Sequence, residues 1–230
     1  MSVPLRSQVL FRITLISLAS ALAGFSLWIL VPEVMRSSVR RLPTNSADAA
    51  MAASSRGTAG WAARLGAVRG DLWSEYAFTY AALLWPRSPQ EPEVTAVADQ
   101  ARAVIERALA YAPYDTSLWL LAASLGSQFN WWRSGTAPIV NMSYYTGPSE
   151  IALTPLRLHV ATRSNALTDS DVQRFVQRDV RMILTRWHEL KPALIATYKD
   201  AAPDAKRFLE SVVADIDPSF LSNMGASTKK

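Results

Sequence analysis

Few residues in this chain have the types and spacing that catalysis requires. Asp169 and Asp171 form a D-x-D pair, an arrangement that can hold a metal ion when it follows a β-strand, but no strand is expected nearby. The two histidines, His159 and His188, lie outside any metal-ligand spacing. Since the chain has no cysteine, no phosphate-binding glycine loop and no nucleophile motif, we expect no enzyme, metal or cofactor.

The segment 129–150 has residues suited to non-covalent binding. This segment is dense in aromatic and polar residues and is interrupted by Gly and Pro, so it is expected to be a loop. Its rings either pack back on neighbouring helices or form a surface suited to sugar rings or to another chain. The candidate partner or glycan surface consists of Asn130, Trp131, Trp132, Arg133, Tyr144, Tyr145 and Glu150.

The carboxylates of Asp169 and Asp171 are better explained by the helix that follows them. Thr168 is predicted to cap this helix, with Asp171 in its first turn, where a carboxylate offsets exposed backbone amides and the helix dipole. Apolar residues then recur at helical spacing and predict one buried face: Val172, Phe175, Val176, Val180, Ile183, Leu184 and Trp187.

The charge of the chain is mildly basic, at +5 for 230 residues. This charge favours contact with anionic lipid or an acidic polymer, but it lacks the dense basic footprint of a nucleic-acid-binding protein, so no nucleic-acid partner is expected. A ridge of Arg174, Arg178 and Arg181 is predicted to be a solvated helix face. An acidic partner or lipid headgroups could also contact this ridge.

An uncharged stretch between Arg12 and Glu33 predicts an N-terminal transmembrane anchor over 13–32, after a short tail over 1–12. At about 1.5 Å per residue, its length matches the roughly 30 Å hydrocarbon core of a bilayer. Trp28 suits an interfacial position, and Pro32 marks the exit. A cleaved signal peptide is the alternative, with a possible site at Ala21–Ala23, but the apolar run continues beyond that site.

The orientation of this anchor is not decided by its flanking charges, because arginines lie on both sides in nearly balanced number. We expect a single-pass protein of the bacterial inner membrane with its body in the periplasm. Ser20 and Gly24 form a small-xxx-small pair that could let two anchors approach closely, so the oligomeric state stays open.

Composition divides the rest of the chain into three parts. The interval 33–70 is rich in Ala, Gly and Ser, and it is predicted to be a spacer containing a frayed helix, which lifts the domain off the membrane. A helical domain is predicted over 71–221. The remaining residues, 222–230, are expected to form a frayed tail.

Within the helical domain, aromatic and small residues follow a helix–turn–helix pattern. The residues that carry it are Trp73, Tyr76, Ala77 and Tyr80, then Ala101, Ile105, Ala108 and Pro113, and then Trp119, Ala122, Ala123 and Gly126. Over Asp71 to Gly126 this pattern resembles the tetratricopeptide repeat, with an insertion after the first helix. The resemblance implies an all-α fold, in which a transmembrane helix precedes a tetratricopeptide-like body that binds proteins. Since one and a half repeats cannot bury their own faces, C-terminal helices must supply another layer.

A second resemblance rests on the residues Met142–Glu150 and Leu153–Leu158. Across Trp119 to Ser164 the chain resembles small single-anchor proteins associated with exopolysaccharide biosynthesis in Gram-negative bacteria. This resemblance implies a non-catalytic, membrane-anchored scaffold in surface polysaccharide biosynthesis or export, with protein partners in an envelope complex. Two alternatives stay open: a carbohydrate-binding module that uses the Asn130–Glu150 loop, or an accessory subunit of another envelope complex.

Overall fold

The computed structural model describes residues 5–36, 46–84, 87 and 89–226, and every regular element in these ranges is helical. The predicted all-α class is therefore confirmed. The α-helices are α1 (Leu5–Val34), α2 (Ser46–Leu65), α3 (Gly70–Leu84), α4 (Pro92–Tyr111), α5 (Thr116–Gln128), α6 (Ala137–Thr146), α7 (Thr154–Arg163), α8 (Ser170–Thr185), α9 (Lys191–Asp200), α10 (Pro203–Ile216) and α11 (Pro218–Ala226). Short 3₁₀ segments precede three of them: η1 (Ile151–Leu153), η2 (Asn165–Thr168) and η3 (His188–Leu190).

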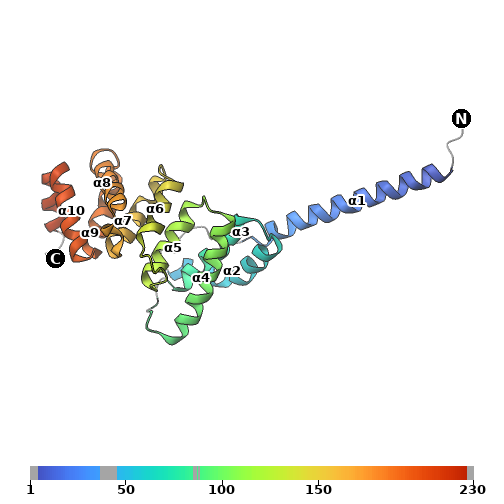
Figure 1. The fold of residues 1–230 in the computed structure, drawn as a ribbon, viewed down its shortest axis with the longest axis horizontal. Helices are drawn as coiled ribbons and strands as arrows, with labels where there is room; N and C mark the ends of the chain where they lie inside the picture. The colour runs from blue at the N-terminus through green and yellow to red at the C-terminus, as the bar shows by residue number, and fades with distance from the viewer. Residues whose placement is uncertain (1–4, 37–45, 85–86, 88, 227–230) are drawn as a thin grey trace.

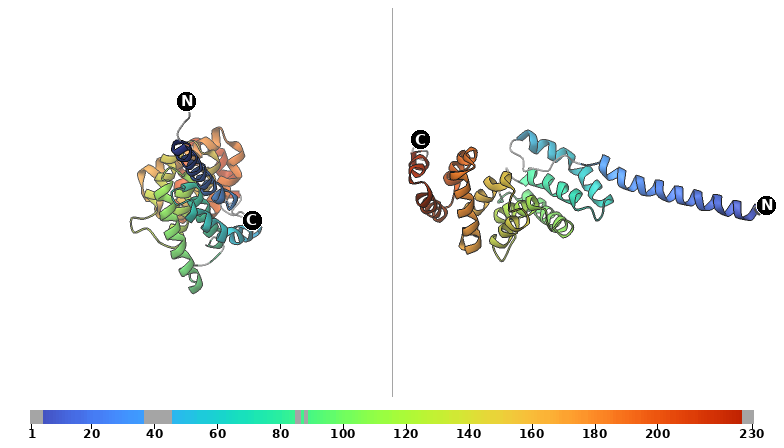
Figure 2. Two further views of the ribbon diagram at one scale, coloured as in Figure 1. Left: turned by 90° about the vertical axis from the view of Figure 1, so that its right-hand side faces the viewer. Right: turned by 90° about the horizontal axis from the view of Figure 1, so that it is seen from above.

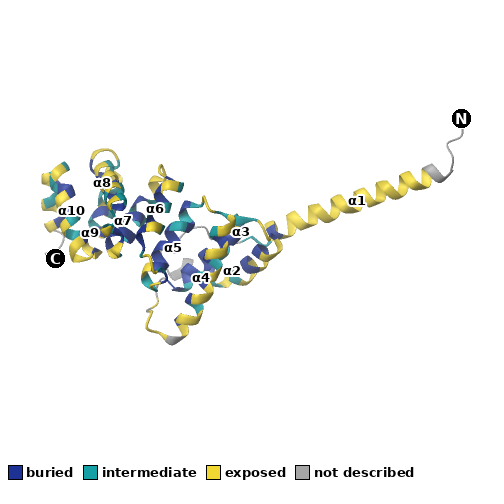
Figure 3. Ribbon diagram, viewed as in Figure 1, coloured by how far each residue is buried: buried dark blue, intermediate teal, exposed yellow. Residues whose placement is uncertain are grey.

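Helix α1 projects from the body as a long rod that is exposed along nearly its whole length (Figures 1 and 3). Its stretch Gln8–Val34 is long and apolar enough to cross a membrane, with a mean hydropathy of 2.0. The helix begins at Leu5, so it includes much of the predicted tail over 1–12, whose first four residues lie outside the described ranges. Among the described residues, α1 is thus the one helix that could serve as a single-pass anchor.

The interval 33–70 differs from the spacer that its composition predicts, because α2 packs along α3 as part of the body. Buried alanines, among them Ala59, Ala62 and Ala63, lie at this contact. A Cβ on Gly60 would stand 3.1 Å from the Tyr76 ring, so the small residue allows the close approach. Packing against α3 therefore stabilises a helix whose own sequence favours it only weakly. The middle of the interval, 37–45, lies outside the described residues.

Helix α5 is the centre of the body and lies between two hydrophobic clusters. Leu118, Leu121 and Leu125 belong to the cluster formed by α2–α5, whereas Leu120 and Ala123 belong to the cluster that extends through α6–α11. A helix that is apolar on all sides is expected to be buried in this way. Figure 3 shows buried segments in α5 and in the helices on both sides of it, toward α3 and toward α7. On the side of the second cluster, α5 packs against α6 and α7.

The predicted buried face of α8 is present, and its cap lies one residue later than expected. Val172, Val176, Val180 and Ile183 are fully buried, Leu184 is buried, and Phe175 and Trp187 are partly buried. Asp169, not Thr168, is the N-cap, because its Oδ1 accepts hydrogen bonds from the backbone N–H groups of Asp171 (2.9 Å) and Val172 (3.1 Å). Thr168 instead ends the 3₁₀ segment η2. The D-x-D pair thus begins with a helix cap.

The segment 129–150 is not a single loop, because α6 forms over Ala137–Thr146. A proline near its start is compatible with a first helical turn. Val140, Ser143 and Tyr144 are buried, and α6 contacts α5, α7 and α8. These long-range contacts favour a helix in a stretch that has little amphipathic signal of its own.

The C-terminal segment also differs from the frayed tail predicted over 222–230. Helix α11 continues to Ala226, and Phe220 and Met224 are buried against the second cluster. Residues 227–230 lie outside the described ranges. The body, viewed from the side and from above in Figure 2, is thus an elongated stack of helices with α1 leaving from one end.

Candidate functional site

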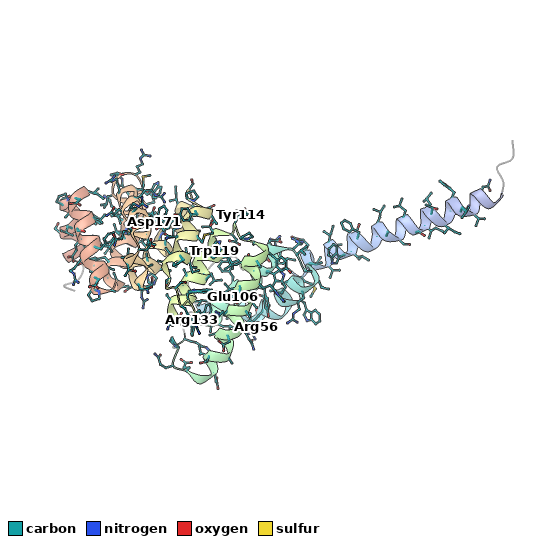
Figure 4. The ribbon with its side chains drawn as sticks, viewed as in Figure 1. Arg56, Glu106, Tyr114, Trp119, Arg133 and Asp171 are labelled. Carbon is teal, nitrogen blue, oxygen red and sulfur yellow. The ribbon has the colours of Figure 1, made fainter. Side chains whose placement is uncertain are left out.

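A polar cleft of about 350 Å³ brings together three of the predicted surface residues, Asn130, Trp132 and Arg133. Its other wall comes from the end of α7 and the start of η2, with Arg163 and Asn165. A neighbouring cavity of about 520 Å³ shares Arg163 and Ser127 with this cleft and is also lined by His159. Burial lowers the pKa of His159, and the nearby Arg163 charge adds to this shift. Figure 4 shows Arg133 on the edge of the body opposite Tyr114.

The cleft walls are held by specific contacts. The Trp132 indole N–H donates to the carbonyl of Ala122 at 3.1 Å, and the Arg102 guanidinium lies 5.6 Å from the centre of the Trp132 ring. On the opposite side, the backbone N–H of Thr136 donates to Asn165 Oδ1 at 3.3 Å. The aromatic and amide groups of the cleft are therefore positioned before any ligand binds.

The other predicted surface residues lie apart from this cleft. Trp131 is buried and stacks on Phe129 at 5.8 Å, and Tyr144 is 1% exposed. Tyr145 is exposed on α6, with its ring edge-on to Phe175, and Glu150 is exposed just before η1. The structure thus separates the seven predicted residues into a cleft group, a buried group and an outer group.

Tyr144 belongs to a buried polar network between α6 and α8. Its hydroxyl donates to Asp179 Oδ2 at 2.9 Å, and its ring stacks on Phe175 at 4.5 Å. Burial raises the pKa of Tyr144, and the nearby Asp179 carboxylate adds to this shift. Burial also raises the pKa of Asp179, although the hydrogen bond from Tyr144 opposes that shift. Both side chains are buried, so they connect α6 to α8 and cannot reach a substrate in this conformation.

Arg157 completes this network, and sequence reasoning missed it. The side chain is 1% exposed, and its Nη2 donates to the carbonyls of Ser143 (2.5 Å) and Gly147 (2.7 Å) at the end of α6. The guanidinium lies 4.7 Å from the centre of the Tyr144 ring. A cation here complements the negative end of the α6 dipole. Nothing near Arg157 in the sequence distinguishes it from a surface arginine.

One arginine of the predicted basic ridge on α8 contacts the buried polar network between α6 and α8. Arg178 lies 5.4 Å from the Phe175 ring centre and 3.4 Å from Asp179 Oδ1, whereas Arg174 pairs with Asp171 on the surface. Arg181 is exposed. The ridge is therefore solvated at Arg174 and Arg181 and packed against aromatic rings at Arg178.

A second group of charged residues joins α1 to the body. Arg36 contacts Glu75 at 2.6 Å and Glu33 at 2.8 Å, and Arg69 contacts Glu33 at 2.9 Å and Asp71 at 2.7 Å. The Glu75 side chain is 2% exposed. Burial raises the pKa of Glu75, and the hydrogen bond from Arg36 opposes this shift. The end of α1 is thus fixed to α3 and to the α2–α3 connection.

Replacing Arg36 with Gln is expected to make stability fall more steeply with pH than in the wild-type protein. Without the Arg36 charge, the pKa of buried Glu75 rises further above its value in the unfolded chain. A raised carboxyl pKa contributes stability at low pH, which is lost as the pH rises through the folded-state pKa. The variant should be close to wild type near pH 4 and less stable by about 2 kcal/mol at pH 7.

Denaturant unfolding at several pH values measures this difference. Arg207→Gln is the matched control, because it removes an exposed pair with Asp204 and should cost at most about 0.5 kcal/mol. A loss of stability in Arg36→Gln that is the same at pH 4 and pH 7 would contradict the assignment of the effect to Glu75.

Metal binding has no arrangement to support it in the part of the chain that the structure describes, where no three His, Asp or Glu side chains converge as ligands. In comparisons with protein-family models, curated proteins and solved structures, no match to this chain was found.

Proposed function

We propose that this protein is a non-catalytic, membrane-anchored scaffold that acts in the biosynthesis or export of a surface polysaccharide. Its setting would be the bacterial inner membrane, with α1 as a single-pass anchor and the body in the periplasm. Its partners would be proteins of an envelope polysaccharide complex.

The observation that carries the scaffold proposal is the fixed attachment of the body to the end of α1. Trp28, within the apolar stretch, donates to the carbonyl of Leu65 at 2.9 Å, and Arg36 pairs with buried Glu75. These contacts hold the body at one place relative to the anchor, as a scaffold requires. Tyr144 and Asp179, whose pKa values are raised by burial, are enclosed and so poorly placed for catalysis.

The polysaccharide setting rests on the resemblance over Trp119 to Ser164. That segment contributes nearly all of the residues lining the polar cleft, including Trp132, Arg133 and Arg163. The cleft is therefore the surface most suited to a partner in such a complex.

The proposal is tested by deleting the gene and measuring exported polysaccharide. Output should fall, and the full chain should restore it, whereas an Arg133→Glu/Arg163→Glu variant should not, because it reverses the charge of the cleft. The matched control is Arg186→Glu/Arg207→Glu, a double reversal at exposed positions just after α8 and on α10, which should restore output. Unchanged polysaccharide output in the deletion strain would contradict the proposed process. An inactive alkaline phosphatase fused after Lys230 would contradict the periplasmic placement alone.

Glycan binding by the same cleft is the second candidate, favoured by the Trp132 ring beside Asn130 and Asn165. Rings and amides together suit sugar recognition. An accessory role in another envelope complex stays the third reading. Binding of purified full-length protein to fragments of the polymer, lost in Trp132→Ala, would favour the glycan-binding module over the protein scaffold.

A further inference from the structure

An apolar stripe on the solvent side of α2 continues the exposed surface of α1. Trp61 is 58% exposed, Leu65 38% and Val68 67%, although the opposite side of α2 is buried against α3. Trp61 and Leu65 are spaced i, i+4, so they share one side of α2, and Val68 is exposed in the turn that follows Leu65. Arg64 lies beside them, with its guanidinium 5.9 Å from the Trp61 ring centre.

The position of this stripe is set by α1. The Trp28 indole N–H donates to the carbonyl of Leu65, so Leu65 lies level with Trp28 along the axis of α1. Figures 1 and 2 show the α2–α3 connection at the end of the body from which α1 leaves. The face that carries Trp61, Leu65 and Val68 therefore adjoins the end of the apolar rod.

The depth of Trp28 follows from the charges that come after it. Glu33, Arg36 and Arg69 form ion pairs that must lie outside the hydrocarbon of a bilayer. Trp28 precedes Glu33 by five residues, about 7 Å along the helix. This distance places Trp28 in the interfacial layer, where Trp is favoured. Trp61, one turn or about 6 Å before Leu65, would lie in the same layer.

We propose that the C-terminal end of α2 is seated in the lipid headgroup layer beside α1, through Trp61, Leu65 and Val68. This inference rests on the proposed membrane anchorage of α1. Trp and aliphatic side chains next to an arginine are the composition that favours this layer, since the rings and chains enter the acyl boundary while the guanidinium reaches lipid phosphate. The body would then rest on the membrane surface, with α2 as a second contact that limits its tilt.

Single-cysteine labelling tests the proposal, because the chain contains no cysteine. Val68→Cys is labelled with an environment-sensitive fluorophore in the full-length protein, which is reconstituted in phosphatidylcholine and phosphatidylglycerol vesicles with spin-labelled lipid. Arg207→Cys is the matched control, at an exposed position on α10, at the end of the body opposite α1 (Figure 1). We expect quenching at Val68 to exceed quenching at position 207 by about threefold or more, because only the first label contacts lipid.

A label at Leu22→Cys, within α1, separates failure of this inference from failure of the anchor. Quenching at Leu22 with none at Val68 would overturn the seating of α2 and leave the anchor intact. No quenching at Leu22 would overturn the anchorage and, with it, this inference. A blue-shifted Val68 label that spin-labelled lipid does not quench would mean that protein covers the stripe, and would also overturn the proposal.

Discussion

Replacing Arg157 with Met is expected to lower the free energy of unfolding by about 3 kcal/mol, because the buried guanidinium is removed while the carbonyl groups that accept its hydrogen bonds stay buried. Met keeps much of the side-chain volume but cannot donate to the carbonyls of Ser143 and Gly147. It also removes the positive charge near Asp179, which burial already makes costly to ionise. Hydrogen bonds from a charged donor contribute about 1.5–3 kcal/mol each, partly offset by the cost of burying the cation.

The measurement is denaturant unfolding of the full chain in detergent micelles, followed by near-ultraviolet circular dichroism of the aromatic residues. For a body of this size, the loss corresponds to a fall in melting temperature of about 6–12 °C. Arg163→Met is the matched control, because Arg163 is exposed at the end of the same helix and should change stability by at most about 0.5 kcal/mol. Equal stabilities of Arg157→Met and wild type would show that the guanidinium contributes no net stability.

Replacing Gly126 with Ala is expected to destabilise the body by about 2–3 kcal/mol, although Ala is the better helix former. A Cβ at this position would stand 1.8 Å from Trp132 Nε1 and 2.4 Å from Cδ1, so the indole must move. Moving it breaks the hydrogen bond to the carbonyl of Ala122 and displaces the ring from beside Arg102. Since Trp132 lines the polar cleft, the substitution should also alter the shape of that cleft.

Gly57→Ala is the matched control for this prediction. Gly57 also lies within a helix, but a Cβ there would meet nothing within 4 Å, so the gain in helix propensity should stabilise the protein by about 0.5–1 kcal/mol. The two substitutions should therefore have opposite signs in denaturant unfolding. A chemical shift change at the Trp132 indole N–H would report the local displacement. Stabilisation by both substitutions would contradict the close packing of Trp132 on α5.

Local pattern in the sequence was enough to predict several elements. The apolar run after Arg12 predicts a membrane-spanning helix, because length and lack of charge are properties of the segment itself. The buried stripe that begins at Val172 follows from helical periodicity and is observed in α8. The N-cap of α8 is Asp169, whereas the sequence predicts Thr168. Both residue types can cap a helix, and the 3₁₀ turn of η2 decides between them.

The candidate site was predicted only in part. Asn130, Trp132 and Arg133 do line a cleft, but its opposite wall comes from α7, about thirty residues further along the chain. Tyr144 lies within the same aromatic segment and is buried, because α8 supplies Asp179 and Phe175 as its neighbours. Composition could indicate that the segment was rich in binding groups, but it could not say which of them face solvent.

The sequence by itself determined the helical class, the long apolar helix α1 and the amphipathic helix α8, since each depends on the residues of a single segment. The tertiary structure decided that 46–65 is a packed helix, that 137–146 is helical and that Arg157 is buried. The physical reason is that these three outcomes depend on packing against other segments: α3 for the alanines of α2, α7 and α8 for α6, and the end of α6 for Arg157. Burial of a charge or of small residues is decided by the surfaces that fold against them.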